Sequence, residues 1–154
     1  MTETNNNKTS NSHSSIVRQL LENAMIIRIA IPDNPYPYLV PICFVYWNDA
    51  IYFHSANSGK KIELLRENNH VTFELDENMG IVENKNICKW SIKYRSIVGH
   101  GLVFSIESES EKYNALKELS KKYGAQARDF SFKIDKGLEI LKIIIEKLTL
   151  KINY

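Results

Sequence analysis

The chain has 154 residues, 44% hydrophobic and 25% charged, a composition typical of one soluble globular domain with a sizeable core. Its formal net charge of +2 is small and its basic residues are interspersed with acidic ones, which argues against a nucleic-acid-binding protein. The two cysteines, Cys43 and Cys88, lie far apart and form no CxxC pair, so we expect neither a disulfide framework nor a metal site.

The first 14 residues are polar and of low complexity, so we expect a disordered tail followed by a single domain over residues 15–154. The tail lacks the apolar core of a signal peptide, and no run is long enough to span a bilayer, so we expect a cytoplasmic protein. Apolar residues at helical spacing predict a short helix over residues 15–24. The β-branched run over residues 25–31 predicts a strand that ends in a turn at residues 32–35.

Residues 36–47 are apolar at both odd and even positions, which predicts one strand with both faces covered. The core can cover one face, and a flat ligand or a second subunit can cover the other. Pro41 cannot donate a ladder hydrogen bond, so it marks an edge, a bulge, or a stretch that faces something other than a strand. A tight turn at residues 48–50 then returns the chain as an antiparallel strand over residues 51–55.

A strand end followed by a helix start at residues 51–65 could bind an anion. We expect Asn57 or Ser58 to cap a helix over residues 58–67, whose first turn leaves backbone N–H groups unpaired. Lys60 and Lys61 lie at that turn, so a phosphate group would suit the site. The alternative is an ordinary surface strand, turn and helix with a solvated lysine pair.

The rest of the chain predicts further strands and one clear helix. Alternating residues indicate a strand over residues 71–75, a loop over 76–86, and a long strand over 87–106 with a bulge or bend at Gly99–Gly101. Ser108 and Glu111 form a capping box for a helix that ends at Gly124. A short helix or loop over residues 126–136 leads to a last strand over 138–152. About six mainly antiparallel strands with three helices predict a small closed barrel.

Three segments together carry a family resemblance. They are P-Y-L-V-P at residues 37–41, I-Y-F-H-S-A at residues 51–56 with Gly59 and Lys61 behind it, and Y-R-S-I-V at residues 94–98 with Gly101. In this order the chain resembles the pyridoxamine 5′-phosphate oxidase-like flavin-binding split barrels, and within them the branch related to 5-nitroimidazole resistance proteins. The resemblance implies a six-stranded antiparallel split β-barrel that binds FMN and forms a homodimer with the flavin at the subunit interface.

The resemblance also implies a set of site residues. The backbone of residues 39–44 would face the isoalloxazine ring, His54 and Ser55 would stand beside the ribityl-phosphate, and Lys60 and Lys61 would hold the phosphate. Ser96 would reach the ring from a neighbouring strand. The implied cofactor-binding residues are therefore Leu39, Val40, Pro41, Ile42, Cys43, Phe44, His54, Ser55, Lys60, Lys61 and Ser96.

The resemblance favours an FMN-dependent oxidoreductase that takes electrons from NAD(P)H and reduces small electrophiles such as nitro compounds. His54 would be its catalytic residue, although a histidine at a strand end can equally be a structural hydrogen-bonding residue. The tryptophan-and-arginine signature of true pyridoxamine phosphate oxidases has no counterpart in residues 143–154, which argues against that reaction. Two alternatives stay open: a flavin-binding or storage module without turnover, and a member of the fold that binds another flat cofactor or none.

Overall fold

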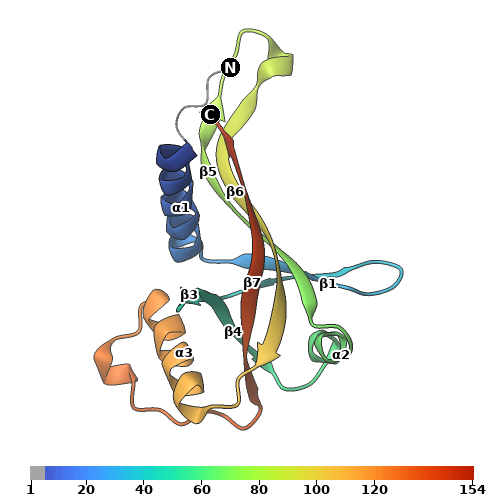
Figure 1. Cartoon of the computed structure of the whole chain (residues 1–154), viewed down its shortest axis with the longest axis vertical. Helices are drawn as coiled ribbons and strands as arrows, with labels where there is room; N and C mark the ends of the chain where they lie inside the picture. The colour runs from blue at the N-terminus through green and yellow to red at the C-terminus, as the bar shows by residue number, and fades with distance from the viewer. Residues whose placement is uncertain (1–5) are drawn as a thin grey trace.

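The computed structural model describes residues 6–154, with side chains from His13 onward, and this part of the chain is mainly β (Figure 1). Its α-helices are α1 (Asn6–Asn23), α2 (Lys60–Glu67) and α3 (Glu109–Lys122), and short 3₁₀ helices cover Ile87–Lys89 and Ala127–Asp129. Its strands are β1 (Ile27–Ile31), β2 (Tyr38–Ile42), β3 (Val45–Trp47), β4 (Ala50–Ala56), β5 (His70–Val82), β6 (Ser91–Ser105) and β7 (Leu138–Asn153).

The strands form one antiparallel sheet in the order β2-β1-β5-β6-β7-β4-β3. The two edge strands, β2 and β3, follow each other directly in the chain, separated only by Cys43 and Phe44. The sheet therefore coils until its edges meet at this junction, although β2 and β3 are not hydrogen-bonded neighbours. The predicted closed, six-stranded barrel is wrong on both points, because the sheet has seven strands and remains open.

The extra strand arises within residues 36–47, which the sequence pattern presents as one strand. The first part pairs with β1, where Val40 lies opposite Ile29, and the second part pairs with β4, where Tyr46 lies opposite Ile51. Both parts bury apolar side chains, so the apolar run continues across the break. Pro41 lies on the edge strand β2, which confirms the edge among the three predicted possibilities.

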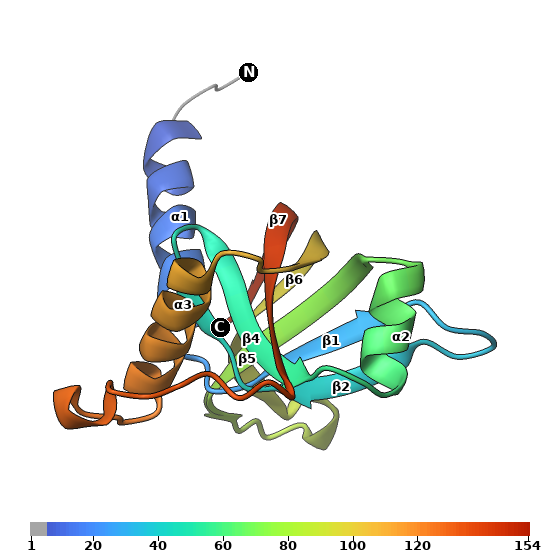
Figure 2. The same ribbon diagram turned by 90° about the horizontal axis from the view of Figure 1, so that it is seen from below.

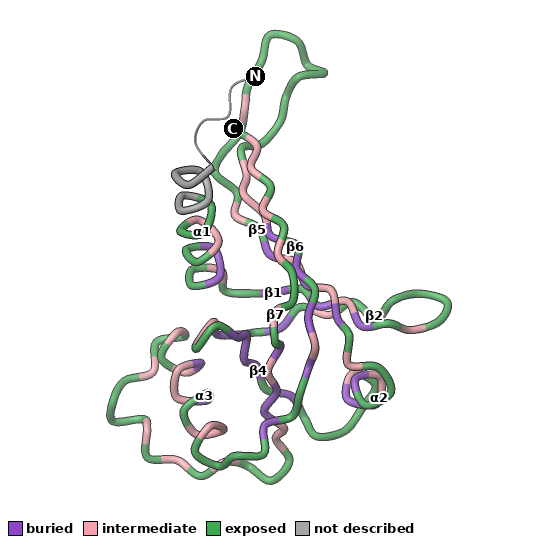
Figure 3. The backbone as a smooth tube through the Cα atoms, in the orientation of Figure 1, coloured by how far each residue is buried: buried purple, intermediate pink, exposed green. Residues whose placement is uncertain are grey.

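Two hydrophobic clusters hold the fold together. The larger lies inside the coiled sheet, and α2 closes one end of it with Ile62 and Leu65. The smaller lies on the outer side of β4, where α3 packs Ala115 and Leu119 against Tyr52. As a result α2 and α3 lie on opposite sides of the sheet (Figure 2), and the buried residues concentrate on the strands between them (Figure 3).

β5 and β6 extend beyond the core as a hairpin arm over residues 76–94, which rises beside α1 (Figure 1). The predicted loop over residues 76–86 is wrong for residues 76–82, which belong to β5. This part of β5 has no buried face, and cross-strand pairs hold it, including Arg95 Nε with Glu77 Oε2 at 2.9 Å. The arm carries exposed apolar side chains: Met79, Ile81, Ile87, Trp90 and Ile92.

The predicted irregularity at Gly99–Gly101 is confirmed as a shift in the β6–β7 register between His100 and Gly101. A Cβ atom at residue 101 would lie 2.4 Å from the carbonyl oxygen of Ile144, so only glycine fits against this backbone. The shift leaves Glu146 of β7 without a direct partner on β6.

The helix starts differ in part from the predicted ones. α1 begins at Asn6, earlier than the predicted helix, so it includes residues 6–14 of the predicted tail, and residues 1–5 lie outside the described part of the chain. Neither Asn57 nor Ser58 caps α2, because Gly59 holds that position with a φ of 100°. Ser108 caps α3 as predicted, by accepting a hydrogen bond from the backbone N–H of Glu111. Within residues 6–154, none of the helices combines the length and apolar composition needed to cross a bilayer.

Candidate functional site

The predicted site residues 39–44, His54 and Ser55 border a split in the β-hairpin that β3 and β4 begin. Val45 pairs with Tyr52, and continuing this register would place Cys43 opposite His54 and Ile42 opposite Ser55. The register does not continue, because β2 turns away from β4 to pair with β1. The strand edges on the two sides of the split therefore face each other without a shared ladder, and a ligand or another chain could occupy the space.

Tyr123, just after α3, closes the end of the split nearest to β3. Its hydroxyl accepts a hydrogen bond from the backbone N–H of Phe44 at 3.1 Å and donates one to the carbonyl oxygen of Met25 at 2.5 Å. Burial is the main cause that raises the pKa of Tyr123. The Tyr123 side chain therefore gives hydrogen-bond partners to the backbone of Phe44 and of Met25, and it holds the chain in place where it crosses from β2 to β3.

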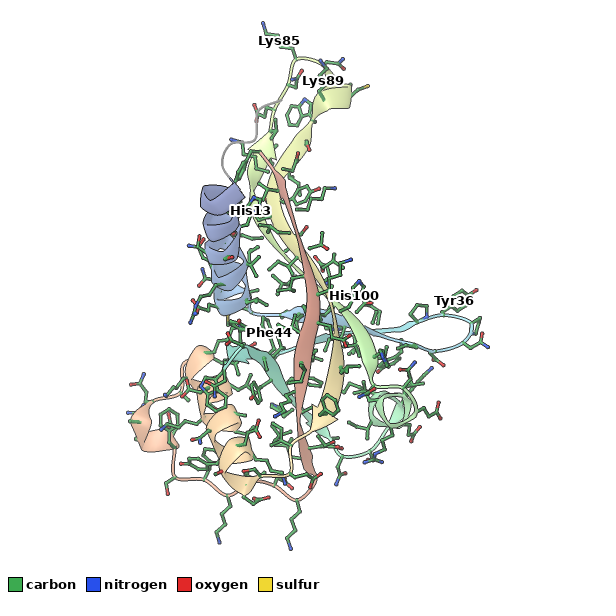
Figure 4. The ribbon with its side chains drawn as sticks, viewed as in Figure 1. His13, Tyr36, Phe44, Lys85, Lys89 and His100 are labelled. Carbon is green, nitrogen blue, oxygen red and sulfur yellow. The ribbon has the colours of Figure 1, made fainter. Side chains whose placement is uncertain are left out.

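Residues 39–44 present two different faces. Ile42 and Phe44 are buried, and Phe44 lies at the junction of α1, α3 and the strands (Figure 4). Leu39, Pro41 and Cys43 are exposed, with Leu39 at 63% exposure. The prediction that both faces of this strand are covered is therefore not met within one chain, and its outer face is free for a ligand or a partner.

His54 and Ser55 are adjacent on β4, so their side chains point to opposite faces of the sheet. Ser55 is buried on the same face as Phe53, inside the coiled sheet and near α2. His54 lies on the same face as Tyr52 and is exposed in the single chain. Although part of His54 meets solvent, neighbouring atoms partly desolvate its ring, and this desolvation, followed by the positive charge of Lys61, lowers the pKa of His54 and favours the neutral imidazole. Because the side chains of His54 and Ser55 point to opposite faces of the sheet, they cannot both contact a phosphate that is bound on one face.

The two lysines at the start of α2 have different surroundings. Lys60 Nζ lies 2.7 Å from Asp33 Oδ2 and 5.6 Å from the centre of the Tyr38 ring, so it ties α2 to the β1–β2 loop. Lys61 is half-buried, burial lowers its pKa, and it has no ion-pair partner among the described residues. A cavity of about 260 Å³ lies beside Lys60, lined by residues 33–39. Lys61 is thus the cation of this region that lacks a counter-charge.

Ser96 lies away from the other predicted site residues. It pairs with Lys151 of β7, whereas His54 pairs with Ile140, eleven residues earlier on the same strand. Eleven residues correspond to about 35 Å of strand. Strands β1 and β5 also separate Ser96 from β2. The single chain therefore does not bring Ser96 to the split that the remaining predicted residues border.

The sequence pattern does not reveal a second group of polar residues around α3. Glu111 Oε1 accepts hydrogen bonds from Lys142 Nζ at 2.8 Å and from the Tyr52 hydroxyl at 3.1 Å, linking α3 to β4 and β7. Burial and this carboxylate raise the pKa of Tyr52 to about 12. At the other end of α3, Lys122 Nζ is buried without a hydrogen-bond partner and lies 3.6 Å from the centre of the Phe44 ring. Only the folded structure reveals that this lysine is buried.

A separate cavity of about 470 Å³ lies on the outer face of the sheet, bordered by His70, His100 and Glu146. His100 Nδ1 lies 3.0 Å from Thr72 Oγ1, and His70 Nδ1 lies 3.1 Å from Asn68 Oδ1. Each histidine therefore has a local side-chain hydrogen-bond partner. Among the described residues, no group of three or more His, Cys, Asp or Glu side chains could hold a metal ion.

Comparison with known proteins gives matches of two kinds. Residues 14–151 match the sequence pattern of the family described as pyridoxamine 5′-phosphate oxidase. Among solved structures, a protein of Bacteroides thetaiotaomicron named as a candidate 5-nitroimidazole antibiotic resistance protein is 27% identical, with a TM-score of 0.74. The match covers 90% of this chain and 82% of that chain. No curated protein sequence matches the chain.

Two more distant structures share the fold. The flavocytochrome Anf3 of Azotobacter vinelandii is 16% identical with a TM-score of 0.75, and the match covers 91% of this chain and 67% of that one. An FAD-binding protein of Mesorhizobium loti is 21% identical with a TM-score of 0.67, covering 92% and 95% of the two chains. Together they show that the open, coiled sheet of this chain is a split-barrel fold.

Proposed function

Because this chain belongs to the pyridoxamine 5′-phosphate oxidase family, we propose that it binds one FMN per subunit along the split between β2 and β4. The ring would lie against the backbone of residues 39–44, and the phosphate would lie at the start of α2. Two of the similar structures support a flavin, because one is a flavocytochrome and the other an FAD-binding protein.

The observation that carries the proposal is the half-buried, unpaired ammonium group of Lys61. A cation held partly out of water without a counter-ion is unfavourable, as its lowered pKa indicates. A phosphate dianion would supply the missing charge and would also accept hydrogen bonds from the free N–H groups of the first turn of α2. Lys60 would contribute less, because Asp33 already neutralises it.

We further propose that the protein is a reductase that uses NAD(P)H to reduce small electrophiles such as nitro compounds. The flavin would supply the two-electron chemistry. His54, on β4 beside the split, would hydrogen-bond to the acceptor or exchange a proton with it. A bound phosphate would raise the pKa of His54 toward neutrality, because its negative charge would oppose the effect of Lys61.

A homodimer would complete the site. The outer face of residues 36–43 includes Tyr36 at 79% and Leu39 at 63% exposure, and a second subunit could cover it. Ser96 lies too far along β6 to reach a flavin in its own chain, so its predicted contact would have to be made across the dimer to the partner's flavin. We propose that the protein works in the cytoplasm, where NAD(P)H is available.

A titration with FMN and with FAD tests the cofactor, and anaerobic addition of NADH or NADPH tests the reaction. The proposal predicts one FMN bound per chain, with bleaching of the flavin absorption by the nicotinamide and recovery when a nitro compound is added. Binding of FMN without bleaching would favour the alternative, a flavin-binding or storage module. Absence of flavin binding would overturn the proposed function.

A further inference from the structure

Lys122 at the end of α3 is a buried cation without a partner. Its Nζ atom has no hydrogen-bond partner and lies 3.6 Å from the centre of the Phe44 ring. The neighbouring Lys121, in contrast, pairs with Glu118 Oε1 at 2.7 Å. An ammonium group removed from water with only an aromatic ring for contact is unfavourable, so its presence calls for an explanation.

The position of Lys122 relates it to the proposed flavin. Phe44 is the last of the residues 39–44, whose backbone would face the ring, and the other end of this stretch lies beside Lys60. The Cys43 thiol is the titratable group that acts on this ammonium group, and the Tyr123 hydroxyl interacts with Cys43 in turn. Burial lowers the pKa of Lys122 to about 8, while Cys43 acts in the opposite direction, so Lys122 is still charged at pH 7. No carboxylate among the described residues neutralises it.

We propose that Lys122 is the counter-charge that stabilises the reduced form of the flavin, an inference that rests on the proposed function. Transfer of a hydride from the nicotinamide, two electrons and one proton, oxidises the nicotinamide and leaves the flavin ring with one additional negative charge. The ammonium group of Lys122 offsets that charge from the buried side of residues 39–44, where it lies against Phe44. Because it lies out of water, its field is weakly screened and acts without direct contact.

The test compares the reduction potential of bound FMN in the wild type, Lys122→Met and Lys121→Met, with dithionite as the reductant. Lys121→Met is the matched control, because it removes an adjacent lysine that is exposed and already paired. In Lys122→Met, the ratio of the affinity for reduced FMN to the affinity for oxidised FMN should fall at least tenfold. This fall corresponds to a reduction potential of bound FMN that is about 30 mV more negative. Lys122→Arg should retain the wild-type potential, and the difference between wild type and Lys122→Met should shrink as the pH rises from 7 to 10.

The outcomes separate the two proposals. Equal potentials in Lys122→Met and Lys121→Met, with FMN bound to both, would overturn the role of Lys122 and leave the proposed function intact. Failure of the wild-type chain to bind FMN would overturn both. Because the substitution removes a buried charge, Lys122→Met should fold at least as well as the wild type, and Lys122→Gln provides a second uncharged variant for the same comparison.

Discussion

Single substitutions of the two lysines at the start of α2 should affect FMN affinity unequally, although the residues are neighbours in sequence. Lys61 is half-buried and has no ion-pair partner among the described residues, so its ammonium group is free to bind phosphate. Hydrogen bonds to charged groups contribute about 1.5–3 kcal/mol, so Lys61→Ala should raise the Kd for FMN by about 10- to 150-fold. Lys60 is exposed and must leave Asp33 before it can bind phosphate, so Lys60→Ala should raise the Kd by less than about fivefold.

Quenching of FMN fluorescence on titration with each variant measures these dissociation constants. Asp33→Asn serves as a further control, because it frees Lys60 and should leave FMN affinity equal to or tighter than that of the wild type. A larger loss in Lys60→Ala than in Lys61→Ala, or no loss in either, would refute the assignment of the phosphate to Lys61.

Three further predictions concern the rest of the molecule. His54→Gln should bind FMN and fold normally but reduce a nitro acceptor about 10²-fold more slowly, and an unchanged turnover number would make His54 structural. The free energy of unfolding of the flavin-free protein should fall as the pH drops through 6.5, because His54 binds a proton more readily in the unfolded chain. Urea titrations at several pH values should show a weaker pH dependence in His54→Gln. Gly101→Ala should lower the free energy of unfolding, measured by urea denaturation, by about 1–3 kcal/mol, since its Cβ atom would lie 2.4 Å from the Ile144 carbonyl oxygen. Gly137→Ala is the control and should have little effect, because nothing lies closer than 3.5 Å to its Cβ position.

The sequence predicts well the elements that bury one face. β7 lies within one residue of its predicted bounds, and β1 ends where predicted but begins two residues later, because their apolar residues alternate or run continuously between turn residues. The break between β2 and β3 leaves no local trace, since it depends on which distant strand each half pairs with. The outer part of β5 is also missed, because a solvent-exposed hairpin arm needs no apolar alternation and is held by cross-strand pairs such as Arg95 with Glu77.

The candidate site was predictable in part. The order of residues 39–44, His54 and the lysine pair indicates a site between two strands and a helix start, and the structure places these segments around one split. The sequence gives no sign that Asp33 occupies Lys60, or that Lys122 is buried, because both depend on tertiary contacts. The distance of Ser96 from the split likewise follows from the register of β6 and β7.

We propose that the unpaired ammonium group of Lys61 selects a flavin that carries a phosphate. Isothermal titration calorimetry of the wild-type chain with FMN and with riboflavin tests this role of the phosphate directly. The two ligands share the ring and the ribityl chain and differ only in the phosphate. We expect binding of one FMN per chain, at least tenfold tighter than riboflavin, with most of this difference lost in Lys61→Ala. Equal affinities for FMN and riboflavin would contradict it.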